Sequence, residues 1–206
     1  MNFTSYADFR TKTQQMFDGD DISQSDLSVA VLDLIIGAGE RRIYRELRSS
    51  TQDSALTGTV ATNLVALPSD FLELRLGPYI GTFVTAIYAP LEAINNQIQI
   101  GAETANHPVY YSFQGDNLIF YPTQADGTVV SGRYYKKFSD ISGGLNALFT
   151  RHPDVFLYAA LAESGPFLGD SRTQIWEQKY VSLVRAANEE ERRRVTRGSK
   201  LTTRVA

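Results

Sequence analysis

The sequence predicts an α+β protein, in which a helical bundle of about four helices is interrupted by a β-rich insertion and followed by an extended C-terminal arm. Residues 1–52 carry apolar side chains at helical spacing, whereas residues 53–140 contain short strand-like runs separated by turn signals. Helical spacing returns over residues 141–194. Residues 195–206 have no such period and are basic, so we expect them to form the arm.

The N-terminal part of the bundle is predicted to hold two helices. Apolar residues at three- and four-residue spacing predict the first over residues 6–17. The second is expected to begin at Ser23 or Ser25 and to extend to about Arg48. Its apolar middle, residues 29–38, predicts burial on several sides, either inside the bundle or between subunits.

A glycine pair in the second helix imitates part of a nucleotide-binding motif. Gly37 and Gly39 follow an apolar run, as the first two glycines of a dinucleotide-binding turn do. The third glycine position is Arg42, and no βαβ pattern follows, so the spacing indicates close helix packing instead.

Four arginines, Arg41, Arg42, Arg45 and Arg48, lie at the end of this helix. Cations are favourable at a helix C-terminus, which explains such a group without any partner. Contact with an acidic neighbour in an assembly is the alternative, and the sequence leaves both open.

The insertion is predicted to contain about five strands, over residues 57–67, 83–88, 109–113, 118–121 and 129–138. A short helix is expected from Leu91 after Pro90. At the corner that follows Leu67, Pro68 predicts a turn, and one helical turn should direct Phe71, Leu72 and Leu74 inward.

The C-terminal part of the bundle is predicted to hold two more helices. Pro153 suits the first turn of a helix that ends at Gly165-Pro166. The last helix should extend to about residue 194, with one buried face formed by Trp176, Tyr180, Leu183 and Ala187.

Charge is distributed unevenly along the chain. The net charge is −3, but residues 1–191 hold 14 basic and 23 acidic residues, whereas the last 15 residues hold six basic residues and no acidic one. Such a division suggests a tail with a partner of its own. There is no cysteine, which excludes disulfides and thiolate metal sites, and no apolar run is long enough for a membrane helix.

Catalytic motifs are missing from the sequence. His107 and His152 are the only histidines, and neither has a nucleophile or a ligand-spaced partner nearby. Residues 18–21 are rich in aspartate but lack the alternating ligands of a calcium loop. We therefore expect no enzymatic activity, no metal and no cofactor.

The order and spacing of several motifs resemble the head-to-tail adaptor proteins of short-tailed bacteriophages. The resemblance extends from about residue 25 to 190, and its motifs are Leu67–Arg75, Pro108–Tyr111, Leu118–Pro122, Tyr134–Lys137 and Pro153–Glu163. It implies a structural protein of the virion that forms a ring, which is dodecameric in these proteins. The ring would bind below the portal protein and carry the tail nozzle, and genome DNA would pass through its channel without specific binding.

Two sets of residues are predicted to make contacts in such an assembly. The resemblance implies that the arm reaches the portal protein or a neighbouring subunit, with contacts from Arg192, Arg193, Arg194, Arg197, Lys200, Leu201 and Arg204. The second set is a cluster of tyrosines in the insertion, Tyr110, Tyr111, Tyr121, Tyr134 and Tyr135. These tyrosines suit packing or subunit contact, or stacking on single-stranded nucleic acid. The alternative to an adaptor is a nucleic-acid-binding protein that uses the basic arm.

Overall fold

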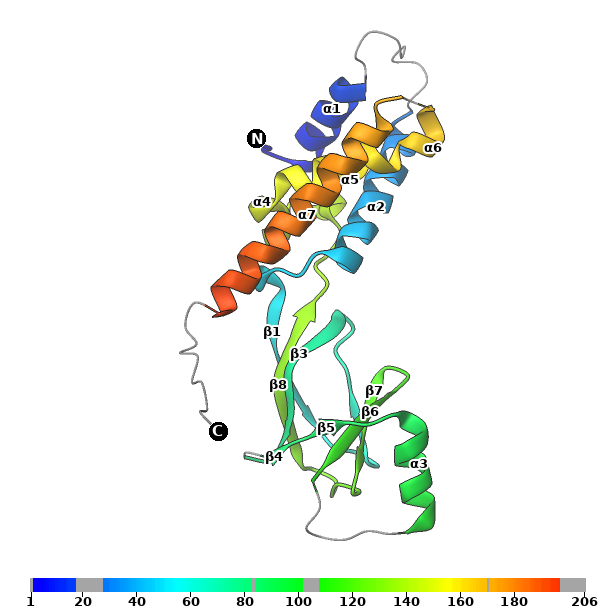
Figure 1. Ribbon diagram of the computed structural model, residues 1–206, viewed down its shortest axis with the longest axis vertical. Coiled ribbons are helices and arrows are strands. Elements are labelled where there is room, and N and C mark those ends of the chain that lie inside the picture. The colour runs from blue at the N-terminus through cyan, green and yellow to red at the C-terminus, as the bar shows by residue number, and fades with distance from the viewer. Residues whose placement is uncertain (1, 18–27, 83, 102–107, 170, 197–206) are drawn as a thin grey trace, which may run out of the picture. The chain divides into compact units, whose positions relative to one another are not determined.

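The computed structural model describes the chain in five stretches, residues 2–17, 28–82, 84–101, 108–169 and 171–196 (Figure 1). The chain forms two compact units. Unit 1 combines residues 1–51 and 138–206, and unit 2 is the continuous segment 52–137. Unit 1 is helical and unit 2 contains two sheets, so the predicted α+β class is confirmed.

Unit 1 contains four long helices, α1 (Tyr6–Phe17), α2 (Val29–Glu46), α5 (Pro153–Glu163) and α7 (Thr173–Thr196). Shorter elements complete it, α4 (Ala147–Arg151), α6 (Gly165–Leu168) and the 3₁₀ turn η2 (Ile141–Gly143), while the turn η1 (Ser50–Gln52) leads into unit 2. The described part of α2 begins after Ser28, whose Oγ accepts a hydrogen bond from the amide of Val31. The predicted start at Ser23 or Ser25 lies outside the described residues.

Helix α5 is the centre of unit 1. It packs against α1, α2, α4 and α7, and most of its side chains are buried: Val155, Phe156, Leu157, Ala159, Ala160, Leu161 and Ala162. We predicted burial on several sides for residues 29–38 of α2 instead. Within unit 1 that prediction is wrong for one face, because Val29 and Leu34 are 55% and 54% exposed. Whether a second subunit covers this face stays a prediction.

The predicted close packing at the glycine pair is confirmed for Gly39. A Cβ atom at this position would lie 2.9 Å from the amide nitrogen of Ala160 and 3.0 Å from the carbonyl carbon of Ala159, so α2 and α5 meet at backbone distance. Gly37 differs, because a Cβ atom there would meet only Nη1 of Arg41, at 3.6 Å. Packing within the described residues therefore requires glycine at position 39 but not at position 37.

Unit 2 is a sandwich of two four-stranded sheets. In strand order they are β1 (Asp53–Thr59), β8 (Val129–Lys136), β3 (Phe71–Ile80), β4 (Val84–Thr85), and β2 (Leu64–Ala66), β7 (Asn117–Tyr121), β6 (Tyr110–Gln114), β5 (Ile87–Tyr88). Buried residues from both sheets, including Leu56, Phe120 and Val130, form one core. Helix α3 (Leu91–Ile100), which the sequence predicted, contributes Ile94 to a second cluster with Ile119 and Tyr121 of β7.

The structure has more strands than predicted because two of the expected runs are divided and because β3 was not expected as a strand. Thr62 and Asn63 have positive φ angles of 49° and 61°, and Ala61 and Leu64 exchange two backbone hydrogen bonds around them. This tight turn divides the expected strand 57–67 into β1 and β2, which belong to different sheets. The expected strand 83–88 likewise separates into β4 and β5.

The predicted helical turn after Pro68 is wrong. The turn itself is present, since the amide of Phe71 donates to the carbonyl of Pro68, but Phe71 already begins strand β3. Phe71 and Leu74 are partly buried against the core between the sheets, so their inward direction is confirmed. Pairing with β8 supplies these residues with backbone partners that a helical turn would have to provide locally.

Candidate assembly surfaces

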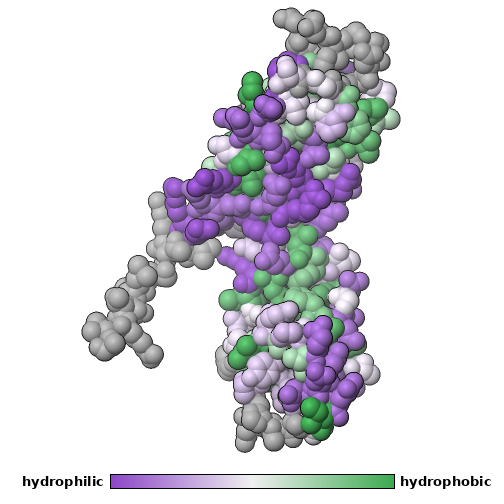
Figure 2. Space-filling model, turned by 45° about the vertical axis from the view of Figure 1, so that its right-hand side comes forward, coloured by the Kyte–Doolittle hydropathy of each residue, from purple (hydrophilic) through white to green (hydrophobic). Residues whose placement is uncertain are grey.

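Helix α7 carries the predicted docking arginines at its C-terminal end and is fixed along its length in unit 1. Trp176, Tyr180 and Ala187 are buried, which confirms most of the predicted face, whereas Leu183 is only partly buried and its neighbour Val184 is buried instead. Figure 2 shows that hydrophilic residues gather on the part of unit 1 where α7 ends. Apolar residues are more frequent at the other end of unit 1, near α6 and the start of α2. Polar contacts hold α7 at three levels, described next.

The first level is an ion-pair network around Arg42 of α2. Its Nη1 and Nη2 donate to Glu177 Oε2 and Oε1 at 2.8 and 2.5 Å, and it also pairs with Glu46 at 3.1 Å and Glu163 at 3.3 Å. The guanidinium lies 4.3 Å from the ring centroid of Tyr180. Hydrogen bonding to Glu177 raises the pKa of Arg42, and the same bonds lower the pKa of Glu177. Arg42, whose side chain is largely buried, therefore connects α2 to α5 and α7 through ion pairs.

The lowered pKa of Glu177 predicts a pH dependence. A carboxyl group with a lowered pKa in the folded state stabilises the fold above its unfolded pKa of about 4.3, and this contribution disappears as pH falls below that value. Because the Glu177 side chain is 41% exposed, we expect at most about 1 kcal/mol. Between pH 6 and 3, the unfolding free energy of wild type should fall more steeply than that of Glu177→Gln in denaturant titrations. Equal pH slopes would contradict this assignment.

The second level is a cap on the end of α2. Oδ1 of Asn188 accepts a hydrogen bond from the Arg48 amide at 3.0 Å, and Nδ2 donates to the carbonyl of Glu46 at 2.9 Å. Arg48 also donates through Nη1 to the carbonyls of Tyr44 and Leu47. These contacts satisfy backbone groups that a helix end leaves without partners. For Arg48, the explanation as a cation at a helix C-terminus is confirmed.

Removal of this cap should destabilise unit 1. We expect Asn188→Ala to lower the free energy of unfolding by about 1–2 kcal/mol, since an amide and a carbonyl both lose their partner. Gln178→Ala, at an exposed position of the same helix, is the matched control and should change it by less than about 0.5 kcal/mol. Equal effects of the two substitutions in thermal unfolding would show that Asn188 does not act as a cap.

The third level lies at the last turns of α7. Glu191 is buried, accepts a hydrogen bond from Ser50 Oγ at 3.1 Å and forms an ion pair with Arg151 at 2.8 Å. Arg194 also donates to Ser50 Oγ. A buried glutamate in the run of charges at 189–194 was not foreseen. The helical period gives a signal, because Glu191 lies four residues after the buried Ala187.

Three of the predicted docking residues are described. Arg192, Arg193 and Arg194 lie together on the last turns of α7 with exposed side chains, and Arg193 pairs with Glu189 at 3.6 Å. Arg197, Lys200, Leu201 and Arg204 lie outside the described residues. The structure thus gives the place from which the basic segment starts.

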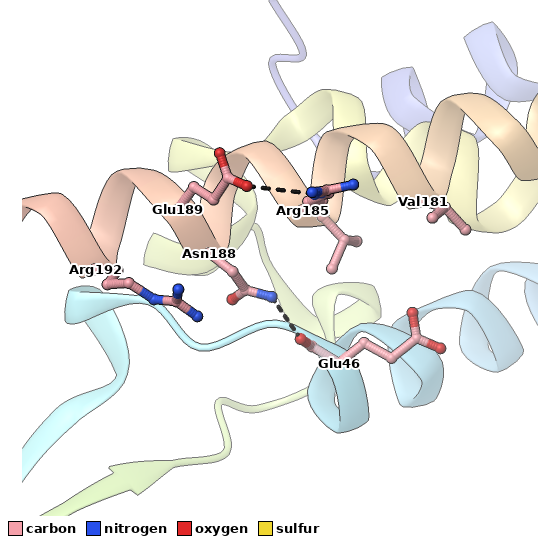
Figure 3. Close-up of a pocket in the computed structure, with 7 residues that line it drawn as sticks. Glu46, Val181, Arg185, Asn188, Glu189 and Arg192 are labelled. Carbon is pink, nitrogen blue, oxygen red and sulfur yellow. Dashed lines mark hydrogen bonds and ion pairs between the residues drawn. The ribbon is translucent and has the colours of Figure 1, made fainter.

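A groove lies beside the C-terminal half of α7, next to the end of α2 (Figure 3). It has a volume of about 430 Å³ and is lined by Glu46, Val181, Val184, Arg185, Asn188, Glu189 and Arg192. Val181 is 50% exposed, so part of the wall is apolar. Arg185 pairs with Glu189 at 3.3 Å on the rim.

The five predicted contact tyrosines do not form one surface. Tyr121 and Tyr134 are buried, and the Oη of Tyr134 donates to Asp70 at 2.8 Å. Tyr110 packs with Tyr121 in the cluster beneath α3, whereas Tyr111 packs against the core between the sheets. Tyr135 lies beside Arg75, whose guanidinium is 5.8 Å from its ring centroid. Tyr110, Tyr111 and Tyr135 keep part of their surface accessible.

Two aromatic residues that the sequence reasoning passed over are more exposed. Tyr88 of β5 and Phe113 of β6 flank Tyr111, with ring centroids 5.7 and 6.1 Å from it. Alternation along β6 places Tyr111 and Phe113 on the same face, which is a signal that the sequence contained.

No catalytic constellation or metal site occurs among the described residues. No three potential metal-ligating side chains gather there, and none of the helices in these stretches is long and apolar enough to cross a membrane. His152 is buried at the start of α5, and desolvation lowers its pKa. His107 lies outside the described residues.

Comparison with known protein families decides between the interpretations. The SU10 adaptor protein family matches residues 4–204, nearly the whole chain. The chain belongs to the SU10 adaptor protein family. No curated protein sequence matches it. The SU10 adaptor match confirms the resemblance to phage adaptors and makes the chain a structural component of a phage virion, where it contacts other virion proteins.

Some of the described surfaces of this SU10 adaptor must therefore contact the other virion proteins. The end of α7, the groove beside it and the accessible tyrosines are the candidates. An assembly role for these surfaces agrees with the structural character of the family.

Proposed function

We propose that this SU10 adaptor forms a homo-oligomeric, dodecameric ring that joins the portal protein to the tail nozzle and surrounds the DNA exit channel. The fixed end of α7 carries the proposal. Glu191 and Arg194 attach the last turns of the helix to Arg151 and Ser50, so every copy in a ring would present its basic segment from an equivalent position. Twelve weak contacts become tight when a ring makes them together.

In this proposal, the basic segment docks on the portal protein. Arg192, Arg193 and Arg194 begin it at the end of α7, and Arg197, Lys200, Leu201 and Arg204 continue it. Six cations without an acidic residue suit an acidic surface on the partner, and Leu201 can fill an apolar pocket. The tail nozzle would bind another face of the ring, for which the accessible tyrosines of unit 2 are candidates.

Passage of DNA requires a channel wall that does not hold phosphate. Residues 1–191 have an acidic excess of nine, from 14 basic and 23 acidic residues, and nonspecific DNA affinity comes mainly from cations. This composition supports passage without specific binding. Acidic residues that line the channel should slow genome ejection when replaced by lysine.

The testing experiment is the mass of the purified protein in solution, alone and mixed with its portal protein. It should compare the full chain with a chain that ends at Thr196, because this truncation leaves the contacts of Glu191 and Arg194 intact. We expect a large complex of the full chain with the portal protein, and its loss on truncation.

A matched variant separates charge from length. Substitution of Arg197, Lys200 and Arg204 by serine keeps all 206 residues and removes three cations. If this variant binds the portal protein as the full chain does, charge is not the basis of docking. A monomer that does not bind the portal protein but binds DNA with steep salt dependence would favour the nucleic-acid-binding alternative.

A further inference from the structure

We propose that the outer face of α2 on one copy packs in parallel into the groove between α2 and α7 of the next copy. The outer face consists of Leu34, Gly37, Ala38, Arg41 and Arg45, and the groove is the one lined by Val181, Val184 and Glu189. This interface rests on the proposed ring and assigns the surfaces that form it. Because the two surfaces differ, the contact is heterologous, which is the type that generates rings.

The outer face of α2 is apolar and flat in its middle. Leu34 is 54% exposed, and Gly37 and Ala38 follow it with little side chain. Glycine in a helix costs about 1 kcal/mol relative to alanine, yet a Cβ atom at position 37 would meet only the flexible Arg41 side chain, at 3.6 Å, so packing in the described residues does not require glycine there. A helix of a neighbouring copy that approaches this face closely would explain why glycine stands at position 37.

The same face carries two cations that have no polar partner among the described residues. Arg41 and Arg45 make no hydrogen bond or ion pair with the residues that the structure describes, whereas Arg42 pairs with three glutamates and Arg48 caps α2. They lie one helical turn apart on the exposed side. Position thus divides the four arginines, because Arg42 and Arg48 have partners within unit 1, whereas Arg41 and Arg45 suit an acidic partner.

The groove offers matching chemistry. Val181 and Val184 form an apolar wall, and Glu46 and Glu189 place carboxylates on its rim. Glu190 follows with a side chain that is 67% exposed, although it pairs with Arg151 at 3.3 Å. Arg185 and Arg192 also lie on the rim, where Glu189 pairs with Arg185 at 3.3 Å and Glu46 pairs with Arg42 at 3.1 Å. The side chains of Glu46 and Glu189 are 41% and 45% exposed, so each carboxylate can accept a second arginine from a neighbouring copy.

Spacing sets the direction of packing. Arg41 follows Leu34 by seven residues, a rise of about 10 Å, and Glu189 follows Val181 by eight residues, a rise of about 12 Å. With the helices parallel, contact between Leu34 and Val181 brings Arg41 and Arg45 alongside Glu189 and Glu190. Apolar and charged contacts then form at the same alignment.

Disulfide trapping tests the contact directly, because the chain contains no cysteine. Leu34→Cys and Val181→Cys variants are purified separately, mixed in assembly conditions with the portal protein present, and oxidised. We expect a disulfide-linked dimer in the mixture and little in either variant alone. Ile175→Cys, exposed on another side of α7, is the control and should not link to Leu34→Cys. A 34–34 dimer, or equal linkage to position 175, would overturn the interface.

A second variant separates this interface from the ring itself. Gly37→Leu should keep or slightly raise the unfolding midpoint of the monomer, because leucine favours a helix over glycine and only the flexible Arg41 side chain lies nearby, but it should raise the concentration for half-assembly at least tenfold. Arg41→Glu with Arg45→Glu should act similarly, and Glu189→Arg with Glu190→Arg should restore assembly. Unchanged assembly of Gly37→Leu, with no linkage between 34 and 181, would leave the ring intact and place its interface elsewhere. Absence of any wild-type oligomer, with or without portal protein, would overturn the ring and this interface together.

Discussion

Arg42→Met is expected to lower the free energy of unfolding of unit 1 by about 2–3 kcal/mol. Loss of one partner from a buried ion pair costs about 3–5 kcal/mol, and the partial exposure of Glu46, Glu163 and Glu177 reduces this. Methionine keeps most of the apolar stem, so the change isolates the guanidinium and its contact with Tyr180.

The measurement is denaturant unfolding followed by the fluorescence of Trp176, the single tryptophan, which packs 6.0 Å from Phe17 in unit 1. Arg41→Met is the matched control, one residue away and without a partner among the described residues, and it should change stability by less than about 0.5 kcal/mol in the monomer. Equal losses in the two variants would show that the network does not stabilise unit 1.

Gly39→Val should lower the stability of unit 1 by about 3 kcal/mol. The added Cβ atom alone would lie 2.9 Å from the backbone of α5, so α2 and α5 must separate or bend. Overpacking of this kind costs about 1–3 kcal/mol, and valine adds branches at the crowded carbon. Backbone atoms cannot move aside as a flexible side chain can.

Gly37→Val provides the control, two residues away in the same helix. Valine and glycine differ little in helix propensity, and the space at position 37 is open, so the change should be below about 0.5 kcal/mol. Thermal unfolding of both variants below the concentration of assembly measures the difference. If Gly39→Val unfolds at the wild-type temperature, the close approach of α2 and α5 does not exist in solution.

The helices were predictable because their burial follows a single period. Trp176, Tyr180, Val184 and Ala187 follow one another on α7 at spacings of four, four and three residues, and the structure buries all four. The same period could have separated the four arginines. Arg42 lies three residues after Gly39, on the flank of the buried side, whereas Arg41 and Arg45 point away from it.

The sheets were less predictable because local sequence does not encode partner strands. Thr62 and Asn63 lack the Asn-Gly pair typical of a tight hairpin, so the break between β1 and β2 gave little signal. The prediction of a helical turn after Pro68 was wrong for a related reason. Phe71 and Leu74 suit a helical turn or a strand, and the choice depends on β8, which is about 60 residues away.

The tyrosine surface shows the limit of composition as a guide to sites. Five tyrosines close in sequence were predicted to share a surface, but alternation along β8 places Tyr134 in the core and Tyr135 on the other face. Tyr134 also belongs to one sheet, whereas Tyr110 and Tyr121 belong to the other. Residues that line an assembly surface are selected by the fold, not by nearness in the chain.

The placement of unit 2 within the sequence of unit 1 has a consequence for biosynthesis. Asp53 of β1 pairs with Tyr135 of β8, so unit 2 leaves and rejoins the chain at neighbouring positions, and all its strands are translated consecutively. Helix α2 emerges from the ribosome before these strands. Its residue Arg42 can pair with Glu163 only after another 121 residues have been translated. At translation rates of 5–20 residues per second, this delay is on the order of ten seconds. Unit 2 can fold during that interval, whereas the side of α2 that later packs on α5 stays uncovered and depends on chaperones or on the nascent chain for protection.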